Sequence, residues 1–458
     1  MQDNKDFLGT EPVGKLLLKL SIPTVIAQLI NMLYNIVDRI YIGHIPGNGS
    51  LALTGVGVCM PLIMIVSAFA ALVSSGGAPR ASIYMGKKKP ESAEEILGGC
   101  FVLQILVSLI LTVVLLVFGK NLLLAFGASE NTLSYALDYM RIYAFGTLFV
   151  QVTLGMNAFI TAQGFASVAM VSVLIGAVAN MILDAVLILG LGMGVAGAAL
   201  ATIISQGLSA LWVVRFLLGK KTGLRIRREN LGLDWKLYGP CLALGLSPFI
   251  MQSTEGVISV CFNASLQRYG GDLAVGAMTI LASVMQFSML PLQGLTQGAQ
   301  PIISYNFGAK NARRVKSAFR LLLICCLSYS ALLWLLAMVF PGTLASIFAT
   351  DKTLISYSAW AMRIYMAASV IFGAQIACQQ TFIALGNAKT SLFLAVLRKI
   401  ILLIPLILIL PLLFRTGEEK VMAVFLAEPV ADTLAVLTTV CTFAYQFRKT
   451  MKDLEETA

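Results

Sequence analysis

The amino-acid sequence predicts an all-α integral membrane protein in which twelve transmembrane helices form two six-helix bundles. Hydrophobic residues make up 58% of the 458 residues and charged residues only 12%, whereas a soluble domain has about 25% charged residues. The apolar residues fall into twelve runs, each long enough to cross a bilayer, which takes about 20 residues. The two halves of the chain also resemble each other, which indicates two similar lobes.

Glycines, prolines or clusters of charge separate the twelve apolar runs. We expect the membrane spans at residues 16–43, 53–78, 95–118, 134–160, 167–190, 195–218, 237–266, 273–299, 317–340, 355–384, 390–414 and 421–447. The longest polar stretch lies between the sixth and the seventh span. The sequence therefore predicts an N-lobe over residues 1–218, a basic cytoplasmic linker over 219–236 and a C-lobe over 237–458.

Short motifs recur at a nearly constant distance along the chain. Met140–Tyr143 recurs in the second half as Met362–Tyr365, and Gly77-Ala78 recurs as Gly298-Ala299. Each half holds six spans, an even number, so both halves enter the membrane the same way round. We therefore expect a pseudo-twofold axis along the membrane normal, with a substrate path in the cleft between the lobes, as in many transporters.

The net charge of +11 follows from the distribution of Lys and Arg over the loops. With the N-terminus inside, the inner segments hold 21 of these residues and the outer loops 5. Cytoplasmic loops of membrane proteins retain Lys and Arg in this way. The sequence thus predicts a multi-pass protein of the cell membrane with both termini in the cytosol, and the basic charge needs no nucleic-acid partner.

Motifs for chemistry are absent from the sequence. The eight cysteines lie mostly inside apolar runs without a CxxC pair, so we interpret them as small packing residues and expect neither zinc nor a disulfide framework. There is no phosphate-binding G-x-x-x-x-G-K-[ST] loop and no catalytic cluster. We expect a protein that is not an enzyme, has no cofactor, and takes its energy from an ion gradient.

Four polar residues of the first half lie at a similar depth within the membrane. Counted at about 1.5 Å per helical residue, Asp38, Asn180, Asp184 and Thr202 all fall in the outer half of their spans. Oxygen atoms of this kind bind hard cations, and paired carboxylates also hold a proton. The four residues therefore predict a coupling-ion site for H⁺ or Na⁺, with no acidic counterpart in the second half. The alternative is that each acid is salt-bridged, Asp38 for example by Arg39.

The second half has one acidic residue near the membrane midplane. Glu255 lies among polar neighbours that include Gln252. An ionised group at this depth is costly and is usually kept for function. We expect Glu255 to face the central cavity and to attract a cationic substrate; the alternative is a hydrogen-bonded carboxyl group that locks the helix.

Two further acids lie on the last span. Glu428 and Asp432 are four residues apart, on one helical face, and we expect them to extend an acidic wall of the cavity. Arg398 and Lys399 lie in span 11, where we interpret them as a pair that snorkels to the membrane interface.

Several motifs resemble the multidrug and toxic compound extrusion (MATE) family. The second half carries Gly298–Ile302 and Asn306–Asn311, and their counterparts in the first half are Gly76–Arg80 and Gly86–Lys88. The segment Tyr34–Gly43 is similar to the first span of the family. The resemblance covers nearly the whole chain and is strongest to the bacterial drug-efflux branch.

The resemblance implies two six-helix bundles in a V and export of amphipathic, often cationic drugs in exchange for H⁺ or Na⁺. It carries the family's ion site onto Asp38, Asn180, Asp184 and Thr202 and its span-7 acid onto Glu255. Where some relatives have an acid in span 10, this chain has glutamines such as Gln375. We expect Gln375 to line the cavity and the protein to function as a monomer in contact with membrane lipid.

Three other functions compete with drug efflux. A lipid-linked oligosaccharide flippase of the same superfamily would need a cationic cavity, which the acids at Asp184 and Glu255 disfavour. A channel would carry a selectivity motif, and a membrane-embedded enzyme would need a nucleophile and a base; the sequence has neither.

Overall fold

The computed structural model describes residues 6–45, 47, 49–232 and 234–456, and this part of the chain contains helices but no strand. Ten of the described helices are long and apolar enough to cross a membrane, and a pair bent by 52° gives an eleventh span. One of the ten, α8 (Trp235–Gly308), is long enough for two spans. The predicted all-α fold with twelve spans is therefore confirmed.

The first bundle contains spans 1 to 6. A short helix precedes it, and a π-helical turn extends the fifth span. Its elements are α1 (Phe7–Thr10), α2 (Val13–Gly43), α3 (Gly49–Gly86), α4 (Pro90–Ala125), α5 (Glu130–Ala162), α6 (Ala166–Asp184) with η1 (Ala185–Gly190), and α7 (Gly194–Leu218).

The second bundle contains spans 7 to 12 and follows a short 3₁₀ turn, η2 (Arg228–Asn230). Its elements are α8, α9 (Ala312–Val339), α10 (Pro341–Ser346), α11 (Lys352–Tyr365) with α12 (Ser369–Ala384), α13 (Ala388–Val396) with η3 (Leu397–Leu403), α14 (Ile404–Ile409) and η4 (Leu410–Leu413), and α15 (Gly417–Glu456).

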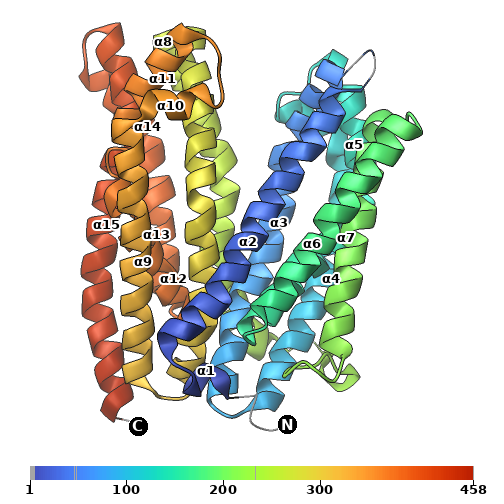
Figure 1. The fold of residues 1–458 in the computed structure, drawn as a ribbon, viewed down its shortest axis with the longest axis vertical. Helices are drawn as coiled ribbons and strands as arrows, with labels where there is room; N and C mark the ends of the chain where they lie inside the picture. Colours follow the sequence, from blue (N-terminus) through green and yellow to red (C-terminus); the bar gives the residue numbers. More distant parts are fainter. Residues whose placement is uncertain (1–5, 46, 48, 233, 457–458) are drawn as a thin grey trace.

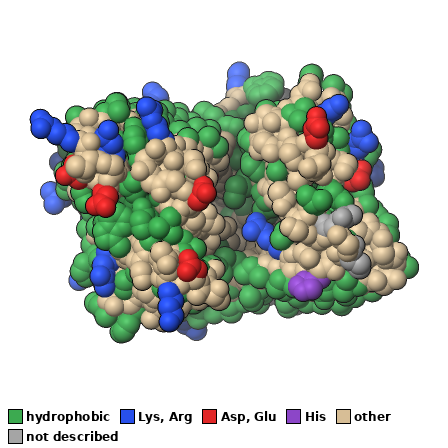
Figure 2. All heavy atoms as spheres, turned by 90° about the horizontal axis from the view of Figure 1, so that it is seen from above, with side chains coloured by type: hydrophobic (Ala, Val, Ile, Leu, Met, Phe, Trp, Pro, Cys, Tyr) green, Lys and Arg blue, Asp and Glu red, His purple; other side chains and the backbone are tan. Residues whose placement is uncertain are grey.

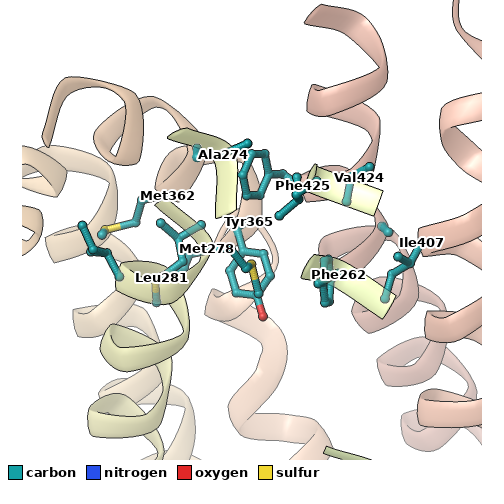
Figure 3. Packing of buried hydrophobic residues seen from close by; sticks show 14 of the residues in the cluster. Phe262, Ala274, Met278, Leu281, Met362, Tyr365, Ile407, Val424 and Phe425 are labelled. Carbon is teal, nitrogen blue, oxygen red and sulfur yellow. The ribbon is translucent and has the colours of Figure 1, made fainter. Parts of the chain in front are cut away.

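Gly271 divides α8 into spans 7 and 8. Its backbone has φ 64° and ψ −161°, a combination that is essentially open only to glycine. The break falls in the gap between residues 266 and 273 where the sequence predicts a loop. Because the chain reverses there, spans 7 and 8 pack side by side in the C-lobe, joined by buried residues such as Phe262 and Met278 (Figure 3).

The two bundles diverge like the arms of a V, with both chain ends at its closed end (Figure 1). Contacts between the bundles are made mainly by α2 and α3 of the first against α8 of the second. The hydroxyl of Thr24 on α2 donates to the Gly294 carbonyl on α8 at 2.6 Å. The first long helices of the two halves, α2 and α8, thus hold the bundles together at the closed end.

Two glycines related by the sequence repeat bring the lobes into backbone contact. A Cβ atom on Gly86 would collide with the carbonyl oxygen of Tyr305, and one on Gly308 with that of Ile83. The two glycines are as far apart in the chain as the two carbonyl residues, so each contact is the pseudo-twofold image of the other. The repeat in the sequence therefore corresponds to a real symmetry of the interface.

We expect Gly86→Ala and Gly308→Ala to lower the free energy of unfolding by similar amounts, about 1–3 kcal/mol each, because either methyl group overpacks the same kind of backbone contact. Thermal melting of the purified variants measures this. Gly239→Ala is the matched control, since a Cβ on Gly239 meets nothing within 4 Å. An unchanged melting temperature for both interface variants would refute the close contact.

The segments that lead into each lobe pack beneath the other lobe. Before α2, the carbonyl of Leu8 accepts hydrogen bonds from Asn306 (2.9 Å) and Arg314 (3.1 Å) of the second bundle. Before α8, Arg227 forms an ion pair of 2.8 Å with Glu94 of α4. This crossing of the entry segments ties the two lobes together at the closed end.

Candidate functional site

A cavity of about 850 Å³ lies between the arms of the V. Most of its wall comes from the first bundle, including Asp38, Tyr34 and Thr202, while Ser259 and Thr279 of α8 contribute from the second. Seen from the open end, the molecule is hollowed between its lobes (Figure 2). The cavity therefore belongs to both lobes, but its polar groups lie mainly in the first.

Asp38, which lines this cavity, lies beside the fully buried Asp184, although the two residues belong to the first and the fifth span. Asp38 belongs to α2 and Asp184 to the last turn of α6, two helices that pack against each other. Their carboxyl groups are near enough to share a hydrogen bond. Two ionised carboxylates can only accept hydrogen bonds, so the pair is favourable only when a proton or another cation lies between them.

Four buried oxygen atoms of this cluster receive no hydrogen bond from the described residues: one of Asp38, both of Asp184 and the side-chain oxygen of Asn180. The side chains of Asn180 and Asp184 are buried, with 1% and 0% exposure. Buried polar groups are nearly always paired, and bare buried charge is strongly unfavourable. Oxygen atoms gathered in this way fit a hard cation or a shared proton.

Thr202 completes the set that the sequence predicts. It lies on α7 and lines the cavity, and its hydroxyl donates to the Ala198 carbonyl at 3.0 Å. Because the hydroxyl proton is donated in that bond, the Thr202 oxygen can act as an acceptor or as a cation ligand. The structure thus brings Asp38, Asn180, Asp184 and Thr202 together in the first lobe, and Asp38 forms no ion pair with Arg39 in the described residues.

Tyrosines that the sequence analysis did not select surround this cluster. Tyr34, Tyr139 and Tyr143 line the cavity, and Tyr34 lies one helical turn before Asp38. The nearby carboxylates interact electrostatically with Tyr34 and Tyr139. The sequence did offer one sign of this arrangement: Tyr34 precedes an intramembrane acid by four residues, which places both on one face of the helix.

The second lobe holds a buried network of opposite charges. Arg398 pairs with Asp432 at 2.7 Å and with Glu428 at 3.2 Å, and all three residues are nearly inaccessible. The interpretation of Arg398 and Lys399 as a snorkelling pair is therefore wrong. Their charges face inward because acids on α8 and α15 lie opposite them, and Asp432 and Glu428 are held in ion pairs rather than exposed as an acidic wall.

Glu255 belongs to both the network and the cleft. One of its oxygens pairs with the Lys399 ammonium at 2.6 Å, yet 52% of its side chain is exposed. Ser259, one helical turn away and on the same face, lines the cavity. Glu255 thus borders the cleft with its charge already compensated, and Gln252, also exposed, lies one turn before it.

Gln375 lies away from the main cavity. Its buried side chain lines a separate pocket of about 30 Å³ that also touches Arg398 and Lys399. The oxygen atoms of Gln375 and Gln379 there have no partner among the described residues. A pocket of this volume has room for a water molecule or two.

Two π-helical turns mark corresponding spans of the two lobes. The turn η1 follows Asp184 in span 5, and η3 carries Arg398 and Lys399 in span 11. π-Helical turns are rare and occur frequently at functional sites. Nothing in the sequence distinguished these turns from ordinary helix.

The chain is similar to curated multidrug exporters over nearly its whole length. It is 25% identical over 438 residues to "Multidrug export protein MepA" of Staphylococcus haemolyticus, and the match spans 95% of both chains. It is 24% identical over 437 residues to the protein of the same name from Staphylococcus aureus, and that match spans 94% of both.

Solved structures share the fold at lower sequence identity. One described as the outward-facing conformation of a multidrug resistance MATE family transporter superposes with a TM-score of 0.90 at 20% identity, covering 98% of both chains. A second, a transporter from Pyrococcus furiosus whose description reports reverse polarity of the binding pocket, gives 0.88 at 20% identity and covers 99% of both. The MatE family model matches residues 23–186 and 248–409, one stretch in each half as the repeat requires, and the chain therefore belongs to the MatE family of transporters.

Proposed function

We propose that this protein is a secondary active multidrug exporter that exchanges amphipathic, often cationic compounds for H⁺ or Na⁺. The observation that carries the proposal is the set of unpartnered oxygens on Asp38, Asn180 and Asp184. Such a cluster is stable when a cation or proton neutralises it and unfavourable when nothing does. Alternating between these two conditions is what an ion-coupled carrier requires.

The shape and lining of the cavity support a drug-sized substrate. Its volume of about 850 Å³ lies in the range of ligand pockets, about 300–1,000 Å³. Asp38 supplies negative charge, and the faces of Tyr34, Tyr139 and Tyr143 attract cations. Substrate and coupling ion would compete for the Asp38 carboxylate, so that binding of one displaces the other.

The orientation follows from the charge of the loops. The excess of Lys and Arg in the inner loops supports cytosolic termini, and the V opens at the end opposite the termini (Figure 1). We propose that this arrangement is the outward-open state, from which a bound drug leaves and an ion enters. We also propose that a single chain suffices for transport, because one molecule supplies both walls of the cavity. Membrane lipid would then surround the two bundles.

The test is substrate efflux from proteoliposomes with a proton gradient and a sodium gradient imposed separately. We expect accumulation of a fluorescent cationic dye to depend on one gradient and to cease when that gradient is collapsed by an ionophore. Transport that persists with neither gradient would contradict ion coupling. Saturation with dye concentration distinguishes a carrier from a channel.

One observation favours a second candidate. Arg39 also lines the cavity, and a cation there would suit the phosphate groups of a lipid-linked oligosaccharide. Arg398 and Lys399 are already neutralised by acids, so the positive charge available to such a substrate is small. Competition for dye efflux by a polyprenyl pyrophosphate, rather than by cationic drugs, would identify the flippase instead.

A further inference from the structure

Two cysteines from opposite lobes meet at the interface near the closed end of the V. Cys100 lies on α4 of the first bundle and Cys241 on α8 of the second, each in the first part of its helix. Both are buried, with 0% and 1% exposure. They belong to one cluster of buried side chains, and their thiol groups are close enough to interact.

Adjacent glycines of α3 hold the two cysteines in place. A Cβ atom on Gly77 would collide with the thiol of Cys100, and one on Gly76 with the backbone of Cys241. The helices of both lobes therefore approach α3 at the same level because no side chain separates them. The thiol of Cys241 donates to the Leu237 carbonyl at 3.5 Å.

A cationic side chain lies beside this pair. Arg80, one helical turn after Gly76 on α3, has its guanidinium next to the Cys241 thiol. Its buried Nε has no hydrogen-bond partner among the described residues. The guanidinium therefore belongs to the immediate surroundings of the two thiols.

We propose that Cys100 and Cys241 form a redox modification site that joins the two lobes by a disulfide. With hydrogen peroxide as the oxidant, the Cys241 thiolate attacks one peroxide oxygen, the O–O bond breaks, and hydroxide leaves, which gives a sulfenic acid. The Cys100 thiol then attacks this sulfur, the S–O bond breaks, and water leaves as the S–S bond forms. The two thiols are oxidised by two electrons and one peroxide is reduced to two waters.

The position of the bond determines its effect. In the outward-open state the two sulfurs are side by side at the closed end of the V. In the opposite state this end opens, and the two lobes separate at the level of the cysteines. A disulfide would therefore hold the closed end shut and stop the transport cycle. This effect on transport depends on the proposed exporter function; formation of the bond does not.

The first test detects the bond itself. The purified full chain, with a protease site inserted between Lys220 and Lys221, is treated with hydrogen peroxide in nanodiscs, alkylated and cleaved. We expect the two halves to remain linked on a non-reducing gel and a Cys100–Cys241 peptide to appear by mass spectrometry, both lost after dithiothreitol. Arg80→Gln should slow the linkage at neutral pH.

Cys100→Ser, Cys241→Ser and the alternative Cys100→Ala should abolish the linkage. Cys378→Ser is the matched control: it changes another buried cysteine, one that neighbours Cys326 within a single lobe, and should leave the linkage intact. Absence of a linked product in the unmodified chain, or its persistence without Cys241, would overturn the proposal.

The second test measures transport before and after oxidation. In proteoliposomes, peroxide should lower dye efflux by at least about tenfold, as expected when a conformational step is blocked, and dithiothreitol should restore it. Cys241→Ser should transport equally with or without peroxide. If the bond forms but transport is unaffected, the link does not act as a lock; if reduced protein transports nothing, the exporter function itself fails.

Discussion

Replacing Asp184 by Asn is expected to abolish gradient-driven efflux while leaving the protein folded. Asn has nearly the shape of Asp but neither binds nor releases a proton, and it attracts a cation far less. The change also removes the repulsion between Asp184 and its neighbour Asp38, so the folded state loses nothing. Efflux from proteoliposomes should fall at least about tenfold, the loss expected when an interaction required in the cycle is removed.

Asp272→Asn is the matched control for this change. Asp272 is exposed at the start of span 8 and accepts a hydrogen bond from Gln267, far in the chain from the acidic pair. It should transport normally, and both variants should melt at or above the temperature of the unmodified protein. Full efflux by Asp184→Asn would defeat the assignment of the coupling site to the first lobe.

Replacing Arg398 by Met is expected to destabilise the C-lobe by about 3–5 kcal/mol, the usual effect of removing one partner of a buried ion pair. The carboxylates of Glu428 and Asp432, residues with 4% and 3% exposure, would then face each other without compensation. Thermal melting in detergent, together with the yield of folded protein, measures the loss.

Combining Arg398→Met with Glu428→Gln and Asp432→Asn should recover most of the lost stability, because no charge of this ion pair network then lacks a partner. Lys316→Met provides the comparison at the surface: the side chains of Lys316 and its partner Glu455 are 48% and 54% exposed, and such pairs contribute about 0–1 kcal/mol. If the single Arg398 change were as mild as the Lys316 change, the network would not be a structural element.

Much of the fold could be predicted from the sequence because membrane spans follow a local rule. A run of about twenty apolar residues crosses a bilayer independently of the neighbouring helices. A repeat in the sequence also indicates directly that the two lobes are related by symmetry. Depth along a helix was also enough to bring Asp38, Asn180 and Asp184 to one level. These three residues could be grouped by depth alone, without knowing how each helix is rotated about its axis.

The arrangement of the C-lobe could not be predicted because it depends on which faces of the helices meet. Arg398 and Asp432 lie 34 residues apart on different helices, and neither depth nor spacing shows that they face each other. The same holds for Cys100 and Cys241, whose apolar surroundings gave no sign of a partner. The π-helical turns likewise depend on packing rather than on local composition.

The crossed entry segments have a consequence for synthesis on the ribosome. The carbonyl of Leu8 is bonded to Asn306, which is made 298 residues after Leu8. At roughly 5–20 residues per second, the first helix waits about 15–60 s for the surface on which it docks. Until then the hydrogen bond between this entry segment and the second bundle cannot form, so the two halves are joined here only after span 8 has been made.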